Sequence, residues 1–369
     1  MSVFAVVTGG GTSGHVIPAL AIAEGLVARG HRVDEIHYVG TAHGVEQRLV
    51  PPTGHPMTLL DVVGLQRSVS KRNLGFAPKM IRATREAKRL LRELRPQVVV
   101  NVGGYASFPA TYAAQRLGIP VVVVSYDLRP GQVSKLLARK AAAVAVAYPG
   151  STLPRAEVTG APVRQTIIDI DRTRDRAAAR TALGWPEDRF VVAVSCGSLG
   201  SQDVNEVVAA TVERLADRRD LAVHHAVGDR FLHRASPERD GAAGILYRVV
   251  GYEERMPEVY AGADLLVTRA GAGTIAELAT AGAPAIVVPW PGAAENHQVD
   301  NARQLSDHGA AILVEQRDLT AERLAAEVER LMADRGALAR LAANAGDAGA
   351  LTRTGALIDV IERAAGGAR

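Results

Sequence analysis

The fold of the first half of the chain follows from Val3-Phe4-Ala5-Val6-Val7-Thr8-Gly9-Gly10-Gly11-Thr12-Ser13-Gly14-His15. Its apolar run is typical of a buried strand, and the glycines after it allow a tight turn into a helix. A strand, a glycine turn and a helix in this order direct backbone N–H groups and the positive helix end toward the carboxyl edge of a sheet. We therefore expect this turn to face a ligand.

A second glycine turn lies in the other half of the chain. Arg269-Ala270-Gly271-Ala272-Gly273-Thr274 follows the apolar run Asp264–Thr268, and Glu277 lies three residues further on. The glycines expose N–H groups, the threonine carries a hydroxyl donor, and the carboxylate can accept hydrogen bonds from both hydroxyls of a ribose. This spacing predicts a site for a nucleoside diphosphate; alternatively, Glu277 only complements the helix dipole.

Composition indicates an α/β protein with two domains. A chain of 369 residues with 47% hydrophobic residues can build two cores of ordinary size. Cys196 is the only cysteine, which excludes an intrachain disulfide framework and is typical of a reducing cytoplasm. We expect no signal peptide, because the chain enters a strand at once, and no apolar run approaches the ~20 residues that span a bilayer.

Short apolar runs alternate with helical patterns, which predicts parallel sheets covered by helices on both faces. The expected strands of the first half are Val3–Thr8, Glu35–Val39, Val98–Val102, Val121–Ser125 and Ala142–Ala147. Those of the second half are Phe190–Ser195, Ala222–Ala226, Tyr247–Val250, Asp264–Val267, Ala285–Val288 and Ala311–Val314. The helical patterns Thr320–Ala333 and Gly336–Gly367 come last.

The alternation breaks between residues 150 and 188, a segment that is rich in proline and charge. We place the linker near Gly160–Thr166. The expected domains are therefore residues 1–163 and 164–342, with a final helix over 343–369 that packs back on the first domain.

Basic residues gather between Arg67 and Arg95, with only Glu86 and Glu93 as acids. Leu74, Phe76, Met80 and Ile81 lie among them. The stretch is either an ordinary solvated helix face or a patch for anionic lipid headgroups. No aromatic stacking series accompanies it, so we do not expect a nucleic acid as partner.

Gly9-x-Gly11-x-x-Gly14 also matches the fingerprint of dinucleotide-binding proteins. Such a site requires an acid at the carboxyl end of the second strand, whereas Asp34 and Glu35 lie at its beginning, so a nicotinamide enzyme is disfavoured. His15 lies in the first turn of the expected helix, where the positive helix end disfavours imidazolium and leaves a neutral base. Alternatively, His15 only packs.

Two further polar loops follow strands of the second half. Ser195-Cys196-Gly197-Ser198-Leu199-Gly200-Ser201 is again a glycine turn that opens a helix, and we expect Cys196 to be packed rather than nucleophilic. The loop Pro289–Gln298 offers amides and a carboxylate that suit the hydroxyls of a sugar, unless it is a plain surface loop. No His/Cys cluster has metal-ligand spacing, so neither a metal nor another cofactor is expected.

In this order, the elements resemble those of the MurG-type glycosyltransferases. The matching stretches are GGGTSGH, NVGGYASFPA, GAPVR, CGSLGS with Asn205, RAGAGTIAEL and AENHQVDNA, and they extend over essentially the whole chain. The resemblance implies a GT-B fold of two Rossmann-like domains and an inverting, metal-independent transfer of N-acetylglucosamine from UDP-GlcNAc to a lipid-linked muramoyl-pentapeptide. It also implies a cytoplasmic enzyme held peripherally on the anionic inner face of the plasma membrane by the basic stretch.

The resemblance further implies roles for single residues. His15 matches the base on the acceptor side, and we expect Asp127 to orient or share the proton. The residues expected to bind the acceptor are Gly11, Thr12, Ser13, Gly14, Gly104, Tyr105, Ser125 and Tyr126. Arg164 is expected to contact the donor. The other residues expected to bind it are Tyr252 (uracil), Ser198, Arg269, Gly273 and Thr274 (diphosphate), Glu277 (ribose) and Gln298 (sugar).

The chain departs from the MurG pattern after the strand Val121–Val124. The family carries a His-Glu-Gln-Asn run there, whereas this chain has Val124-Ser125-Tyr126-Asp127 before Pro130-Gly131. Three alternatives to the MurG reaction therefore stay open. They are a MurG-like paralogue that glycosylates another lipid or a secondary metabolite, a UDP-sugar 2-epimerase, and a non-catalytic protein that binds a nucleotide sugar.

Overall fold

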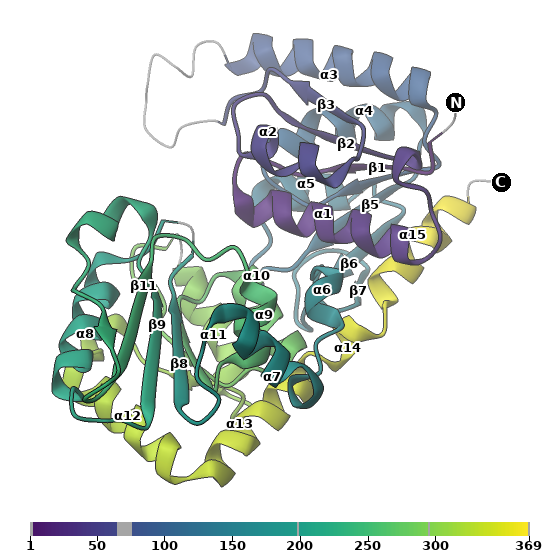
Figure 1. The fold of residues 1–369 in the computed structure, drawn as a ribbon. Helices are drawn as coiled ribbons and strands as arrows, with labels where there is room; N and C mark the ends of the chain where they lie inside the picture. Colours follow the sequence, from purple (N-terminus) through teal and green to yellow (C-terminus); the bar gives the residue numbers. More distant parts are fainter. Residues whose placement is uncertain (1–2, 65–75, 198, 294–295, 368–369) are drawn as a thin grey trace. The chain divides into compact units, whose positions relative to one another are not determined.

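The computed structural model describes residues 3–64, 76–197, 199–293 and 296–367. The chain divides into two compact units (Figure 1). Residues 1–165 and 351–369 form the first unit, and residues 166–350 form the second. Each unit contains one sheet of seven strands with helices on both faces, so the predicted α/β class is confirmed.

The first unit is a doubly wound sheet in the order β3-β2-β1-β4-β5-β6-β7, and all its neighbouring strands are parallel. Helices α1 and α15 cover one face and α3 and α4 cover the other (Figure 1). The strands are β1 (Ala5–Thr8), β2 (Ile36–Thr41), β3 (Met57–Leu60), β4 (Val98–Asn101), β5 (Val121–Ser125), β6 (Ala143–Val146) and β7 (Ala156–Val158). The helices are α1 (Ser13–Ala28), α2 (Glu46–Leu49), α3 (Phe76–Leu94), α4 (Phe108–Leu117), α5 (Gln132–Ala138) and α15 (Ala356–Gly366).

The second unit repeats this plan in the order β10-β11-β9-β8-β12-β13-β14, with only the β10–β11 pair antiparallel. Its strands are β8 (Phe190–Ser195), β9 (Leu221–Ala226), β10 (Arg239–Asp240), β11 (Leu246–Val250), β12 (Leu265–Thr268), β13 (Ala285–Val287) and β14 (Ile312–Leu313). Its helices are α7 (Arg172–Leu183), α8 (Gln202–Arg214), α9 (Met256–Gly262), α10 (Ala272–Ala281), α11 (His297–Ser306), α12 (Ala321–Ala333) and α13 (Arg335–Ala348). The short helices α6 (Gln165–Ile168) and α14 (Ala350–Arg353) lie where the chain passes between the units.

Both sheets reverse their strand order at one point, which is where open α/β sheets bind ligands. The reversal falls between β1 and β4 in the first unit and between β8 and β12 in the second. Thr8 pairs with Val39 and Asn101, so the strands around the first reversal end at nearly the same level. Both predicted glycine turns follow strands at these reversals.

Three short strands were not expected from the sequence, namely β3, β7 and β10. Each ends or extends a sheet edge, where a strand needs no continuous apolar run because one side faces solvent. The single helical pattern Gly336–Gly367 was wrong, because α13, α14 and α15 are separate helices. Gly355 takes a left-handed conformation with φ of 76° and begins a new helix there.

Candidate functional site

The first glycine turn joins β1 to α1 and places His15 in the first turn of that helix. The Thr12 hydroxyl lies 3.3 Å from His15 Nδ1, which orients the imidazole. Burial lowers the pKa of His15, while the negative charges of Asp127 and Glu46 act in the opposite direction. The predicted neutral imidazole agrees with this direction, although burial rather than the helix end is its main cause.

The pocket beside His15 is lined by residues that follow three neighbouring strands. It has a volume of about 210 Å³. Gly104 and Tyr105 follow β4, and Ser125, Tyr126 and Asp127 close β5 and the loop after it. The structure thus brings these five predicted residues together with His15.

Gln132 and Ser134 of α5 also line this pocket and were not found from the sequence. The signal available was Pro130-Gly131, since a helix that starts just after a strand end returns its first residues to that end. Tyr126 is more buried than expected of an acceptor contact, and its hydroxyl donates to the Gly14 carbonyl. Its side chain therefore fastens the turn.

The backbone of the first turn forms a hydrogen bond within the first unit that the sequence did not predict. The N–H of Gly11 donates to Glu46 Oε1 over 2.9 Å. The expectation that this turn directs its N–H groups at a ligand is therefore wrong at Gly11, because a buried carboxylate occupies that direction. Glu46 was not found from the sequence, since nothing in its local pattern marks it.

The second glycine turn joins β12 to α10 and is open at its second glycine. A Cβ placed on Gly273 would meet no atom within 4 Å. Thr274 and Glu277 follow on the same helix, and both side chains are partly exposed. The Tyr260 hydroxyl donates to Glu277 Oε2 over 2.9 Å, which fixes the carboxylate that the sequence assigns to a ribose.

Arg269 lies differently from what a direct contact with the diphosphate requires. It is buried, and its Nη2 donates to Ser201 Oγ over 2.6 Å and to Gln316 Oε1 over 2.7 Å. Its Nη1 donates to the Val288 carbonyl over 3.2 Å. In this structure Arg269 therefore connects the start of α8 with the ends of β12 and β13.

Gln298 connects two of the predicted loops. Its Oε1 accepts N–H bonds from Trp290 over 2.9 Å and from Ala270 over 3.3 Å. It thus lies beside both the second glycine turn and the loop after β13. Tyr252 follows β11 and is 44% exposed, as a stacking surface requires.

The other two residues predicted to bind the donor are Ser198 and Arg164. Ser198 lies outside the described residues. Arg164 belongs to the first unit rather than the second. Burial raises the pKa of the Cys196 thiol to about 12, which agrees with a packed cysteine rather than a nucleophile.

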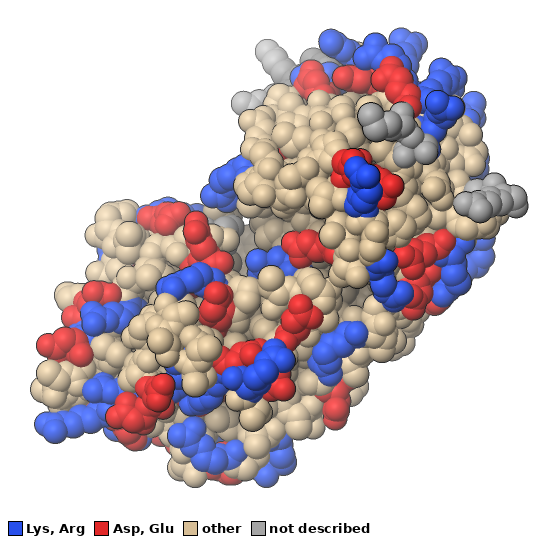
Figure 2. All heavy atoms as spheres, turned by 45° about the vertical axis from the view of Figure 1, so that its right-hand side comes forward, with Lys and Arg blue, Asp and Glu red and all other residues tan. Residues whose placement is uncertain are grey.

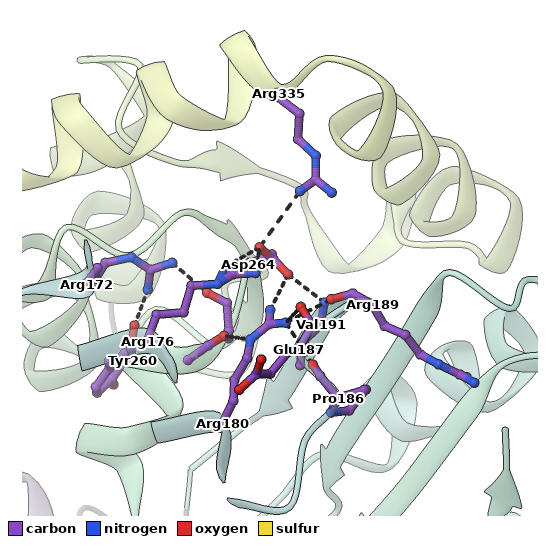
Figure 3. Close-up of polar contacts among 12 residues, drawn as sticks. Arg172, Arg176, Arg180, Pro186, Glu187, Arg189, Val191, Tyr260, Asp264 and Arg335 are labelled. Atoms are coloured by element: carbon purple, nitrogen blue, oxygen red, sulfur yellow. Dashed lines mark hydrogen bonds and ion pairs between the residues drawn. The ribbon is translucent and has the colours of Figure 1, made fainter. Parts of the chain in front are cut away.

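The backbone at Tyr260 is held by a cluster of arginines on α7 (Figure 3). Arg172 donates to the carbonyls of Tyr260 and Ala263. Arg180 Nη2 and Arg176 Nη1 donate to the buried Asp264 carboxylate over 2.6 and 2.9 Å. These bonds attach α7 to α9 and to the start of β12, so the segment that carries Tyr260 has a rigid support.

Comparison with known proteins shows to which family the chain belongs. The model of the glycosyltransferase family 28 N-terminal domain matches residues 5–146, and that of its C-terminal domain matches residues 191–354. A Clavibacter michiganensis protein, named UDP-N-acetylglucosamine--N-acetylmuramyl-(pentapeptide) pyrophosphoryl-undecaprenol N-acetylglucosamine transferase, is 40% identical over 94% of this chain and 92% of its own. This chain belongs to glycosyltransferase family 28.

Other relatives agree with membership of family 28. A Mycolicibacterium vanbaalenii protein of the same name is 40% identical over 93% of this chain and 86% of its own. The crystal structure of Acinetobacter baumannii MurG aligns with a TM-score of 0.74 and 28% identity, over 98% of this chain and 100% of that one. The resemblance to MurG-type enzymes and the GT-B fold are therefore confirmed, and the chain is a glycosyltransferase.

Proposed function

We propose that this family 28 enzyme transfers N-acetylglucosamine from UDP-GlcNAc to a lipid-linked muramoyl-pentapeptide, with inversion at the anomeric carbon. The observation that carries the proposal is the match, over more than nine-tenths of the chain, to relatives that are named for this reaction. The two glycine turns support it, because each half holds the side chains that one of the two substrates needs.

On the acceptor side, His15 removes the proton from the attacking hydroxyl. Its imidazole is held at Nδ1 by Thr12 and lines the pocket beside Asp127. The Asp127 charge favours the imidazolium that forms when the proton is taken up. Gly104, Tyr105 and Ser125 would hold the acceptor, with Gln132 and Ser134 as added contacts.

On the donor side, Glu277 holds the two ribose hydroxyls in the orientation set by Tyr260. The N–H groups at Gly273 and Thr274, at the start of α10, stabilise the charge that develops on the leaving UDP. Tyr252 stacks near the uracil, and Gln298 contacts the sugar. Arg164 and Ser198 complete the donor set, and Arg269 acts by holding the strand ends in place.

The surface that meets the membrane is the exposed face of α3. Ala83, Ala87 and Leu91 are buried on one side of this helix, while Arg82, Arg85, Arg89 and the 54% exposed Ile81 lie on the solvent side. Figure 2 shows basic side chains gathered at this end of the first unit. Anionic headgroups attract such a face, and the Ile81 side chain can enter the headgroup layer.

This assignment would place the enzyme peripherally on the inner face of the plasma membrane, where its lipid-linked acceptor is found. Within the described residues, no helix combines the length and apolar character needed to cross a bilayer. The earlier part of the basic stretch, residues 67–75, lies outside the described residues. Cosedimentation with anionic rather than zwitterionic vesicles tests the surface, and reversal of Arg82, Arg85 and Arg89 to glutamate should abolish it.

A second candidate function is glycosylation of a different lipid or of a secondary metabolite. The run Ser125-Tyr126-Asp127 favours it. At this wall of the pocket the Tyr126 ring and the Asp127 carboxylate stand where the family carries amide groups, and the Ser125 hydroxyl stands where it carries a carboxylate. A change of both shape and charge at an acceptor wall alters which hydroxyl can be bound.

The deciding experiment measures UDP release from UDP-GlcNAc with and without a short-chain lipid-linked muramoyl-pentapeptide. Acceptor-dependent release with a disaccharide product supports the proposal. Tight UDP-GlcNAc binding without such release supports the second candidate. An epimerised sugar formed without an acceptor would indicate the 2-epimerase, and binding with no product under any condition would indicate a sensor.

A further inference from the structure

A buried carboxylate, that of Glu46, lies directly beneath the first glycine turn. Glu46 is the first residue of α2 and is fully buried. Its Oε1 accepts the N–H of Gly11 over 2.9 Å and the N–H of Thr41, at the end of β2, over 3.0 Å. One oxygen therefore joins the turn after β1 to the end of the neighbouring strand.

Three glycines surround the Glu46 carboxylate, and their lack of a side chain leaves space for it. A Cβ added to Gly10, Gly40 or Gly44 would lie 2.1, 2.8 or 2.0 Å from atoms of the Glu46 side chain. Oε2 is buried and has no hydrogen-bond partner among the described residues. Burying a carboxylate with one unpaired oxygen costs folding free energy. The three glycines nevertheless leave space for the Glu46 side chain, which indicates that it contributes to the neighbouring site.

The neighbouring site is His15, which the same turn positions. The turn continues from Gly11 to Thr12, whose carbonyl accepts the His15 N–H over 3.1 Å and whose hydroxyl lies 3.3 Å from His15 Nδ1. A turn fastened at Gly11 thus holds the group that orients the imidazole. The other ring edge faces Gly103, where an added Cβ would lie 3.3 Å from Nε2.

The charge of Glu46 acts on the same imidazole. Among the described residues, the titratable groups that line the pocket with His15 or act on its charge are Glu46 of α2, Tyr105 after β4, and Tyr126 and Asp127 after β5. Both carboxylates raise the pKa of His15 against the effect of burial. A base that is buried without such charges would bind a proton more weakly and would be less effective at neutral pH.

We propose that Glu46 is a positioning residue for catalysis, which fastens the first glycine turn and keeps His15 oriented and basic. The inference rests on the proposed function in one respect, namely that His15 is the base. Since Gly11 gives its N–H to Glu46, the first turn serves to carry the base, and stabilisation of the leaving diphosphate is left to the second turn.

The test compares Glu46→Gln with the wild type and with Glu24→Gln. Gln has the size of Glu and can still accept a backbone N–H, but it lacks the charge. Glu24 is a matched control, since its Oε2 also accepts a backbone N–H within the first unit, from Gln165 over 3.2 Å. We expect Glu46→Gln to lower kcat/KM for the acceptor by about tenfold and to leave the affinity for UDP unchanged.

The pH profile separates this role from a structural one. Removal of the negative charge lowers the His15 pKa, so the acidic limb of kcat/KM should move to lower pH in Glu46→Gln and stay in place in Glu24→Gln. NMR titration of the His15 ring, assigned with a His15→Asn variant, reads the same shift without any turnover. It therefore remains informative if the muramoyl acceptor proves wrong.

Gly44→Ala provides a second test if Glu46→Gln does not fold. It would displace the carboxylate while keeping its charge, so kcat should fall and the acidic limb should remain near its wild-type position. The proposal is overturned if Glu46→Gln moves neither the His15 titration nor the acidic limb, or if Gly44→Ala retains full kcat.

Discussion

The glycine turn after β1 is filled by side chains of the protein itself, whereas the glycine turn after β12 is open. A Cβ on Gly10 would lie 2.1 Å from Glu46, and one on Gly11 would lie 2.7 Å from Tyr105. A Cβ on Gly273 would meet no atom within 4 Å. Glycine is therefore needed in the first turn for internal packing and, under the proposed function, in the second for close approach of a ligand.

The acidic residues near the two turns also differ in their exposure and in what they bind. Glu46 lies beneath the first turn and is bonded to its backbone. Glu277 lies beyond the second turn on α10, is partly exposed and is oriented by the Tyr260 hydroxyl. Under the proposed function, similar strand–turn–helix units carry a base in one domain and bind an anion in the other.

The largest effect should follow from removal of the base in the first turn. His15→Ala is expected to lower kcat/KM by about 10²–10⁴-fold, because general base catalysis contributes that much. The affinity for UDP, measured by calorimetry, should not change. The exposed His43→Ala is the control, and activity of His15→Ala within about threefold of wild type would contradict the assigned role.

Removal of the acid near the second turn should act on binding instead. Glu277→Ala is expected to weaken UDP binding by about 10–100-fold, since hydrogen bonds to charged groups contribute about 1.5–3 kcal/mol. Titration with UDP checks this, with the exposed Glu322→Ala as the control. An unchanged affinity would remove Glu277 from the donor site.

A pair of glycine substitutions tests the comparison directly. Gly10→Ala should destabilise the fold by about 1–3 kcal/mol, because the buried Glu46 carboxylate has no room to move. Gly273→Ala should leave stability unchanged or raise it by up to about 1 kcal/mol, because alanine is the better helix former.

Thermal unfolding and UDP titration of both glycine variants read the result. Gly273→Ala should weaken UDP binding while Gly10→Ala should not. If both variants lost stability alike, or if Gly273→Ala bound UDP normally, the two turns would not differ in the proposed way.

A smaller effect is expected at the support of Glu277. Tyr260→Phe removes one hydrogen bond to this carboxylate and should weaken UDP binding by about 2–10-fold, in line with about 0.5–1.5 kcal/mol for a typical bond. The exposed Tyr112→Phe is the matched control. Equal UDP affinities in the wild type and Tyr260→Phe would show that the bond does not hold Glu277 for binding.

The smallest effect concerns pH. Burial lowers the pKa of His15 below its usual 6.5, so the neutral base is already formed above that pH. The acidic limb of kcat/KM for the acceptor should therefore be centred below pH 6.5, where His15 takes up a proton. An acidic limb centred above pH 6.5 would contradict the burial argument.

The strand–turn–helix units and the α/β class could be predicted from the residues alone. Val3–Thr8 with its glycine turn and Leu265–Thr268 with its own could be recognised because apolar runs and glycines act locally. The residues after Val121–Ser125 could be placed at one sheet edge for the same reason, since parallel strands present their carboxyl ends together. Cys196 could be judged inert from the lack of a neighbouring base.

The side chains that meet at those strand ends could not be predicted, because they come together only in the folded chain. Glu46 reaches Gly11 across 35 positions, and Arg269 turns to Ser201 across 68 positions. Tyr260 meets Glu277 because α9 and α10 pack beside each other. Such contacts depend on strand order and on how each helix is rotated, and no local pattern encodes either. The edge strands escaped notice because β7 and β10 carry charged residues in place of an apolar run, and Thr58 interrupts the apolar residues of β3.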